Sequence, residues 1–337
     1  MSLLLQQLNK NPFVLAPMAG ITDKPFRSFM EDMGCSVVIT ELVSATGLKF
    51  NSEKTRRIMS FAQKDIPIGV QIFGDSLEDL AFATKEVEQM GADFVDLNFG
   101  CPVNKVVKKG GGAAILKDLP RVRDVFRTTK SASSLPVTVK IRTGWDDETK
   151  NSIELAQIAY DEGLEWVAIH GRTRAQAYKG QADWDYIKKV KQESKLPILG
   201  NGDLTSANKA VGKLKDSGCD GVMIGRGCLK NPWIFKEASH QLNGKSKVEN
   251  KKFIDVFEKL NKYLEKDCTE RIHMLQLKKL SSWYATGYPN SSHYRKQVFQ
   301  IKEKQELLDL IYSYFTKLDS IDQKDTSKED FLMGGHG

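Results

Sequence analysis

The chain has 337 residues, of which 50 are Lys or Arg and 43 are Asp or Glu, so its formal net charge is +7. This length predicts one large domain with a smaller one, or two of moderate size. A hydrophobic content of 40% excludes a mainly disordered chain, because enough apolar surface is available to offset the ordering entropy. No apolar run approaches the ~20 residues of a membrane-spanning helix, so we expect a cytoplasmic protein with no membrane partner.

The cysteines and histidines give no sign of a metal centre. Five of each are present, widely spaced, with no C-x-x-C pair and no metal-ligand spacing among the histidines. We therefore predict no metal and no disulfide scaffold. Most of the thiols are expected to be reduced and buried.

Short β-branched runs alternate with longer helical patterns up to residue 225. Each run is continuously apolar, as is typical of strands that are covered on both faces. The predicted strands are Val14–Met18, Val37–Thr40, Ile68–Phe73, Phe94–Asn98, Val137–Ile141, Trp166–His170, Pro197–Gly200 and Gly221–Ile224. The helical patterns include Leu77–Met90, Pro120–Lys130, Ser152–Asp161 and Ser206–Lys215. Eight strand–helix units in ~230 residues predict an α/β fold of the (β/α)8 TIM-barrel type.

An open, doubly wound sheet is the alternative to the barrel. Such a sheet carries a glycine-rich dinucleotide fingerprint after its first strand. Here Gly225 and Gly227 follow the last predicted strand, and Lys230 stands where a third glycine belongs. The pattern therefore favours the barrel.

The pattern changes after about residue 243, where Asn243 and Gly244 break the alternation. The helical stretches that follow are Phe253–Cys268, Arg271–Tyr284, Ser292–Gln300 and Lys302–Leu318. We therefore predict a barrel domain at residues 1–242, a smaller all-α domain at 243–321 and a flexible C-terminal tail at 322–337.

The predicted helical domain holds most of the basic excess per residue. Residues 241–320 carry 15 basic and 10 acidic side chains, against 33 and 29 in residues 1–240. The basic residues are interleaved with aromatic ones such as Trp283, Tyr284 and Tyr294. This mixture suits a polyanion with stackable bases, and a solvated helical surface is the alternative.

Polar, basic or glycine residues close most of the predicted strands, at the end of a barrel where active sites lie. Two segments, Gly200–Asp203 and Gly225–Gly227, follow the seventh and eighth strands, where phosphate groups commonly bind. Arg226 can complete an anion clamp there. A phosphate-bearing cofactor or substrate is implied, although two ordinary glycine turns are the alternative.

Other strand ends suit the remainder of such a cofactor. The segment Pro17–Gly20 permits close backbone approach, and Gln71 and Lys140 suit the N1/O2 edge of a flavin. A lysine that reaches past the strand end into solvent is the alternative for Lys140.

Cys101 stands apart from the other cysteines. It follows a predicted strand in a turn-forming stretch, and a basic, glycine-rich loop comes after it. A partly exposed thiol on such a loop can act as a nucleophile or a proton donor. An acyl-transfer role is disfavoured, because no base motif accompanies the cysteine.

Six ordered motifs resemble the tRNA-dihydrouridine synthase family, particularly its bacterial B-type branch. These motifs are Ala16–Asp23, Asp96–Pro102, Lys140–Trp145, His170–Arg174, Asn201–Asp203 and Met223–Arg226. The resemblance implies an FMN-binding barrel, a helical RNA-binding domain, and NADPH as the electron donor. It implies that FMN is bound by Pro17, Met18, Ala19, Gln71, Lys140, His170, Asn201, Gly202, Asp203, Gly225 and Arg226. It also implies that Cys101 is the catalytic proton donor.

The implied reaction is reduction of the C5–C6 double bond of specific uridines in tRNA to dihydrouridine, and other structured RNA is a second candidate substrate. We assign RNA contacts to Asn98, Arg142, Arg172, Lys278, Lys279, Arg295 and Lys296. Leu280 stands where the family often has histidine, so some RNA contacts are expected to differ.

Two other functions compete with this one. A small-molecule FMN oxidoreductase of the dihydroorotate dehydrogenase type shares the phosphate loops but leaves the basic helices without a role. A non-catalytic RNA-binding protein does not need Cys101, Lys140 and Arg226 together. We expect the protein to be a monomer.

Overall fold

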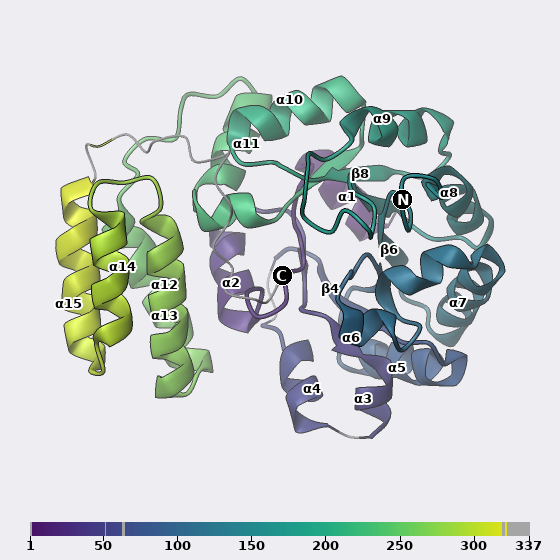
Figure 1. Ribbon diagram of the computed structural model, residues 1–337, viewed down its shortest axis with the longest axis horizontal. Helices are drawn as coiled ribbons and strands as arrows, with labels where there is room; N and C mark the ends of the chain where they lie inside the picture. Colours follow the sequence, from purple (N-terminus) through teal and green to yellow (C-terminus); the bar gives the residue numbers. More distant parts are fainter. Residues whose placement is uncertain (1, 51, 63–64, 319–320, 322–337) are drawn as a thin grey trace.

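The computed structural model describes residues 2–318 and 321, apart from 51 and 63–64. The predicted tail at 322–337 therefore lies outside the described residues. A strand-containing body and a group of four helices, α12–α15, lie side by side in Figure 1.

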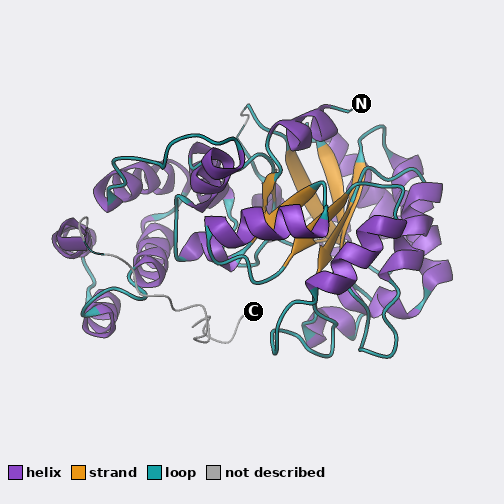
Figure 2. Ribbon diagram, turned by 90° about the horizontal axis from the view of Figure 1, so that it is seen from above, coloured by secondary structure: helices purple, strands orange, loops and turns teal. Residues whose placement is uncertain are grey.

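Eight parallel strands form the barrel, in the order β1-β9-β8-β7-β6-β5-β4-β2. They are β1 (Phe13–Leu15), β2 (Val38–Ile39), β4 (Ile68–Phe73), β5 (Phe94–Phe99), β6 (Val137–Arg142), β7 (Val167–His170), β8 (Ile198–Asn201) and β9 (Gly221–Ile224). The ring closes where the Leu15 N–H donates to the Val37 carbonyl at 3.1 Å. Figure 2 shows the strands surrounded by helices. The predicted barrel is confirmed, and the open sheet is wrong.

Alternate residues of each strand point to opposite sides of the barrel wall. One set, including Phe94, Trp166 and Met223, fills the interior, and the other packs against the helices. The interior cluster also contains Leu4 and Leu8 of α1 (Leu3–Lys10), a helix that the sequence did not predict. Because these leucines meet residues near the strand starts, α1 covers the N-terminal end of the barrel and leaves the other end for a site.

The barrel helices are α2 (Lys24–Asp32), α3 (Ala45–Lys49), α4 (Glu53–Met59), α5 (Leu77–Gln89), α6 (Asn104–Val107), α7 (Leu119–Ala132), α8 (Ser152–Asp161), α9 (Trp184–Glu193), α10 (Ala207–Ser217) and α11 (Ile234–Leu242). Side chains of Asp23, Asp118 and Ser206 accept the first free backbone N–H groups of α2, α7 and α10. A further strand, β3 (Val43–Ser44), pairs with the end of β4. Three 3-10 turns are also present, namely η1 (Gly112–Lys117), η2 (Arg226–Leu229) and η3 (Thr316–Leu318).

The four C-terminal helices are α12 (Phe253–Asp267), α13 (Glu270–Tyr284), α14 (Ser291–Gln300) and α15 (Lys304–Phe315). The rings of Phe257 and Phe315 pack at a tilt of 50° inside this group, with 4.6 Å between their centroids. Phe253 reaches the barrel side and packs edge-on against Trp233 at 4.9 Å. A single apolar core therefore runs across the predicted domain boundary.

Two kinds of feature are absent from the described residues. In that part of the chain, no helix combines the length and the apolar character needed to cross a membrane. The same residues contain no group of three or more His, Cys, Asp or Glu placed to hold a metal ion.

Candidate active site at the barrel mouth

Polar side chains replace apolar ones at the interior positions where the strands end. Strand register pairs Asn98 with Lys140 and His170 with Asn201, and Gln71 hydrogen-bonds Asn98 from β4. In a barrel, this is the face on which functional groups gather. The structure therefore brings these five predicted site residues together.

Lys140 and Asn201 form a fixed pair in this mouth. The Lys140 Nζ donates to the Asn201 Oδ1 at 3.0 Å, and the Asn201 Nδ2 donates to the Met223 carbonyl at 2.8 Å. Burial lowers the pKa of Lys140 to about 8, with help from the charge on Arg142 and against the opposing effect of Asp96. The ammonium group is thus charged at neutral pH but readily titrated.

Positive charge accumulates around His170. Its pKa is lowered well below the usual range, first by burial and then by Arg142, Lys140, Arg172 and Arg226. His170 is therefore neutral at pH 7. Several cations that converge on one partly desolvated place favour binding of an anion there.

Two glycines follow the ends of β8 and β9, at the positions where the sequence predicts an anion site. Gly202 has φ +131°, and a Cβ there would lie 2.5 Å from the Ala182 Cβ. At Gly225, the nearest atom to an added Cβ is 3.6 Å away. Arg226 follows directly, with its guanidinium 5.0 Å from the centroid of the Tyr178 ring.

Arg142 and Arg172 are buried and hold loops together. The Arg142 Nε donates to the Gly100 carbonyl at 2.7 Å, and its Nη1 donates to the Ala177 carbonyl at 2.7 Å. The Arg172 Nη2 donates to both Asp203 carboxylate oxygens, at 2.9 and 3.0 Å. These contacts place both arginines and Asp203 at the mouth, while their guanidinium and carboxylate groups bind protein atoms. Their roles toward RNA and cofactor stay predictions.

The Cys101 turn begins where β5 ends. The Cys101 N–H donates to the Asn98 Oδ1 at 2.9 Å, and the Cys101 carbonyl accepts from the Ala113 N–H at 3.1 Å. Gly112, with φ +58°, folds the loop back so closely that a Cβ would lie 2.8 Å from the Cys101 carbonyl oxygen. Burial raises the pKa of the thiol, so Cys101 is protonated at neutral pH.

The loop after β1 touches the C-terminal helices. The Thr22 hydroxyl binds both the N–H and the carbonyl of Met18, at 3.0 and 3.1 Å. Pro17 and Ala19 flank Met18 in this loop. The carbonyl of Gly20 accepts a hydrogen bond from the Lys279 Nζ of α13 at 2.8 Å. The Gly20 N–H donates to the carboxylate of Glu41, a residue that the sequence did not indicate.

The other predicted RNA contacts lie on α13 and α14, and only Lys279 among them is bonded to the barrel mouth. Lys278 donates to the Ile301 carbonyl, Arg295 donates to Thr286 at 3.5 Å, and Lys296 is exposed.

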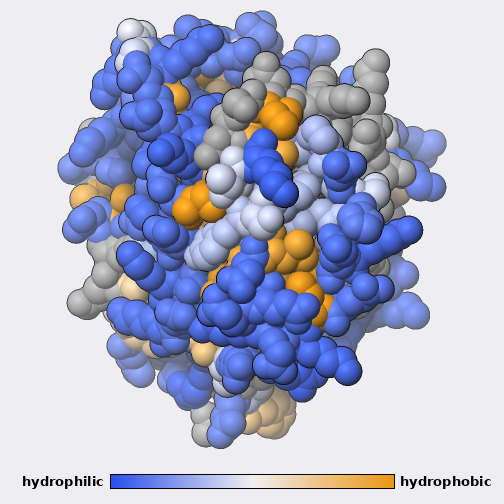
Figure 3. All heavy atoms as spheres, turned by 90° about the vertical axis from the view of Figure 1, so that its left-hand side faces the viewer, coloured by the Kyte–Doolittle hydropathy of each residue, from blue (hydrophilic) through white to orange (hydrophobic). Residues whose placement is uncertain are grey.

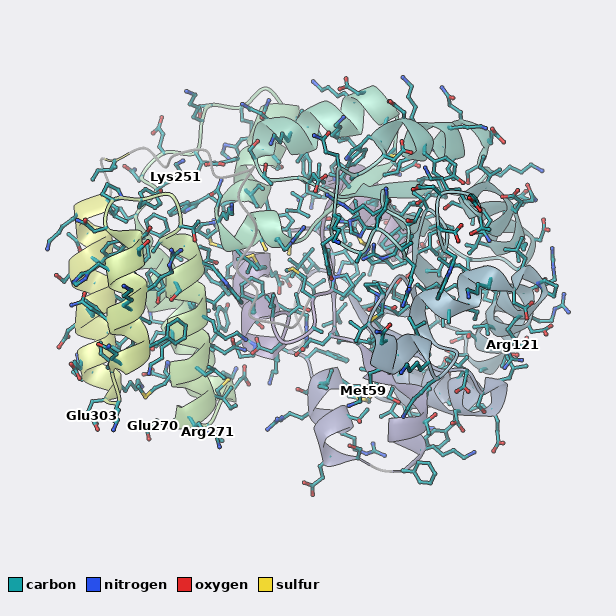
Figure 4. The ribbon with its side chains drawn as sticks, viewed as in Figure 1. Met59, Arg121, Lys251, Glu270, Arg271 and Glu303 are labelled. Atoms are coloured by element: carbon teal, nitrogen blue, oxygen red, sulfur yellow. The ribbon has the colours of Figure 1, made fainter. Side chains whose placement is uncertain are left out.

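Figure 3 shows that the outer face of the C-terminal helical domain is mainly hydrophilic. Figure 4 places Glu270 and Arg271, at the start of α13, at the same end of the domain as Glu303 before α15. Arg271 is an exposed cation on α13 that the sequence analysis did not select.

Comparisons with known proteins agree with this geometry. A family model described as dihydrouridine synthase (Dus) matches residues 14–319. A probable tRNA-dihydrouridine synthase of Rickettsia conorii is 36% identical over 93% of this chain and 95% of its own length. A tRNA-dihydrouridine synthase B of Shewanella oneidensis is 35% identical over 92% of this chain and 97% of its own. One from Pseudomonas syringae is 42% identical over 69% of each chain.

Solved structures agree at the level of fold. Histamine dehydrogenase from Rhizobium sp. 4-9 has a TM-score of 0.50 at 13% identity, and an amine oxidase from Pseudomonas geniculata N1 has 0.53 at 16%. Each match covers 69% of this chain, and it covers 46% and 48% of those two chains. The matched portion is thus about half of each larger protein, and the likeness concerns the barrel fold alone.

Proposed function

Because the chain belongs to the dihydrouridine synthase family and is a tRNA-dihydrouridine synthase, we propose that it binds FMN in the barrel mouth and uses NADPH to reduce uridine in tRNA. The observation that carries this proposal is the gathering of Lys140, His170, Arg226 and the two glycine turns in one place. The family is flavin-dependent, and this set of residues suits a flavin that carries a phosphate.

The residues present fit FMN on chemical grounds. Gly202, Gly225 and Arg226 would hold the phosphate, since partly buried positive charge there favours binding of an anion. Lys140 would face the N1/O2 edge of the ring, where a cation stabilises negative charge. Gln71 would lie next to it, with one hydrogen of its NH2 group given to Asp96 and the other left for the flavin. Bound flavin supplies hydride transfer, and the protein supplies orientation and electrostatics.

Cys101 is proposed as the proton donor to uridine C5. A general acid must be protonated at the operating pH, and burial keeps this thiol neutral. The bonds from Asn98 and Ala113 hold its backbone at the mouth. A half-buried, protonated thiol suits an acid better than it suits a nucleophile.

RNA is proposed to approach across α13 and α14. A target uridine must leave its stack to reach the barrel mouth, which costs a few kcal/mol and is least costly in a loop. The Lys279 contact with Gly20 places α13 next to the predicted flavin loop. Basic side chains of these helices would bind the phosphates of the flanking nucleotides.

Neither competing function accounts for the whole chain. The small-molecule oxidoreductase leaves α12–α15 unused, although the family model extends to residue 319. The non-catalytic binder leaves the cationic mouth and the Cys101 turn unused. Flavin absorbance in the purified protein would support the two enzymatic functions. A colourless protein that fails to bind added FMN would favour the non-catalytic RNA-binding protein.

Mapping dihydrouridine by mass in RNA from cells that lack this chain tests the function directly. We expect specific tRNA uridines to lose their modification and to regain it on complementation with the wild-type chain. Complementation with Cys101→Ala should restore it poorly. Unchanged dihydrouridine in tRNA from the deletion strain would contradict the proposal.

A further inference from the structure

A carboxylate with no assigned role lies below the site, inside the barrel. Asp96 occupies an interior position of β5 and is fully buried, with 0% of its surface exposed. The Thr138 hydroxyl donates to its Oδ1 at 2.6 Å, and the Gln71 Nε2 donates to its Oδ2 at 2.6 Å. Burial of a charge is costly, so a fully buried Asp needs a reason beyond filling space.

The hydrogen bonds continue upward from Asp96 to the Cys101 turn. The Asn98 Nδ2 donates to the Gln71 Oε1 at 2.7 Å. The Asn98 Oδ1 then accepts the Cys101 N–H at 2.9 Å and the Gly100 N–H at 3.3 Å. Two side-chain amides therefore connect the buried carboxylate to the backbone of the turn.

The chemistry of Asp96 fixes the direction of this chain of bonds. An ionised carboxylate only accepts hydrogen bonds, whereas an amide side chain can turn over and exchange its donor for its acceptor. With Asp96 as acceptor, Gln71 must turn its NH2 group downward and its oxygen toward Asn98. Asn98 must then donate to Gln71 and keep its oxygen for the Cys101 N–H.

We propose that Asp96 is a positioning residue, which orients the Gln71 and Asn98 amides and thereby holds the Cys101 turn at the barrel mouth. Its consequence for turnover rests on the proposed function, in which Cys101 protonates uridine. The ordering of the two amides rests on the contacts alone. Sequence reasoning missed this role because the partners lie on β4 and β6, and only the strand register brings them together.

The charge state of Asp96 agrees with this role. Burial raises its pKa to about 6, while Thr138, Gln71 and Lys140 act in the opposite direction. The carboxylate is therefore mainly ionised at neutral pH and acts as a pure acceptor.

The first variant is Asp96→Asn, which keeps the shape but lets position 96 donate as well as accept. Both directions of the amide chain then become available, and in the reversed one the Cys101 N–H faces a donor. We expect alkylation of Cys101 by iodoacetamide, in flavin-free protein, to become roughly threefold to tenfold faster, as the loss of one hydrogen bond implies. Half-buried Cys268 serves as the internal reference in peptide mass mapping.

The second variant combines Asp96→Asn with Gln71→Glu, which exchanges the acid and the amide. A carboxylate at position 71 accepts from both neighbours, so Asn98 must again keep its oxygen for Cys101. We expect alkylation at the wild-type rate. This rescue is not expected if Asp96 merely stabilises the fold.

The control is Thr138→Ser, which removes a buried methyl group beside Asp96 but keeps the hydroxyl donor, so that the carboxylate stays ionised and the amide direction stays intact. Thermal stability should fall while the Cys101 alkylation rate stays within about twofold of wild type. The same acceleration in Thr138→Ser as in Asp96→Asn would overturn the proposal, and so would a wild-type rate in Asp96→Asn.

If Asp96→Asn fails to fold, the exchanged double variant still decides. A wild-type alkylation rate in it supports the proposal, and a fast rate overturns it. Neither flavin nor RNA is present in these measurements. Failure of the proposed tRNA activity would therefore leave their outcome unchanged, and the two failures can be told apart.

Discussion

Two side chains of the site depend strongly on burial for their chemistry. Burial raises the pKa of the Cys101 thiol and lowers the pKa of the Lys140 ammonium group to about 8. Both shifts disfavour the charged form, as desolvation does. At neutral pH the mouth therefore holds a protonated thiol and a mainly charged ammonium group, the forms that the proposed proton donation and flavin binding require.

Cys101→Ala should separate the two halves of the reaction. Reduction by NADPH should proceed at the normal rate, because the thiol is not needed for it. Reoxidation by tRNA should slow by the ~10²–10⁴ typical of a lost general acid. Stopped-flow traces of flavin absorbance measure both steps, and Cys268→Ala is the matched control. Wild-type reoxidation in Cys101→Ala would end the proton-donor assignment.

Lys140 predicts a pH dependence of flavin reduction. Its pKa is lowered to about 8, so the charged form prevails below that pH and is lost as the pH rises through it. Reduction by NADPH should therefore slow above about pH 8 in the wild type. In Lys140→Met it should be slow throughout and lack this step. Identical pH profiles for the two proteins would assign Lys140 to another role.

At the scale of elements, strands were predictable where a run of apolar residues is continuous. Ile68–Phe73 and Gly221–Ile224 have the predicted bounds. The first strand was predicted to reach Met18 but ends at Leu15, because Pro17 has no N–H for the ladder and Met18 bonds to Thr22 instead.

Other elements depend on contacts between distant parts of the chain. The helix α1 was missed, because its leucines are buried only by packing against the open N-terminal end of the barrel, which lies far away in the sequence. Site residues at strand ends, such as Lys140 and Asn201, could be predicted because the fold places all strand ends on one face. The hydrogen-bond partners of these residues could not be predicted, because the register between neighbouring strands decides which side chains meet. The bond between Gln71 and Asp96 and the bond between Arg142 and the Ala177 carbonyl are examples.

The contact between α13 and the loop after β1 predicts a difference between two lysines. Lys279 binds the Gly20 carbonyl, whereas Lys296 is exposed on α14. Lys279→Met should therefore accelerate FMN dissociation, while Lys296→Met should leave it unchanged, although each variant loses one positive charge. Fluorescence of released flavin measures both rates. Equal FMN retention in the two variants would show that the contact of Lys279 with Gly20 does not affect the flavin site.

At the scale of the whole molecule, the C-terminal helices and the barrel are closely joined. The Lys24 Nζ lies 2.6 Å from the Asp267 Oδ1, and the Tyr263 hydroxyl donates to Asp32 at 2.7 Å. Removal of the helices after residue 242 would also expose the apolar partners of Phe253. A truncated barrel is therefore expected to aggregate, and RNA binding is best tested in the full chain.

Affinity for tRNA should fall steeply as the salt concentration rises, because the Lys and Arg side chains of the protein displace salt cations from the RNA phosphates on binding. The double variant Arg295→Ala/Lys296→Ala should reduce the slope of log K against log salt by ~0.7–0.9 for each phosphate that the protein no longer neutralises. Lys188→Ala/Lys189→Ala, on exposed positions of α9, is the control and should keep the wild-type slope. Equal slopes in the two double variants would place the RNA on another face.

The most direct test of the account is the reaction of the NADPH-reduced protein with an unmodified tRNA transcript, without oxygen. The flavin absorbance should return as the transcript is added, and the transcript should gain the mass of two hydrogens at one or more specific uridines. Free uridine or a free pyrimidine base at the same concentration should not reoxidise the flavin. A protein that stays reduced with tRNA but is reoxidised by the small pyrimidine would contradict the account.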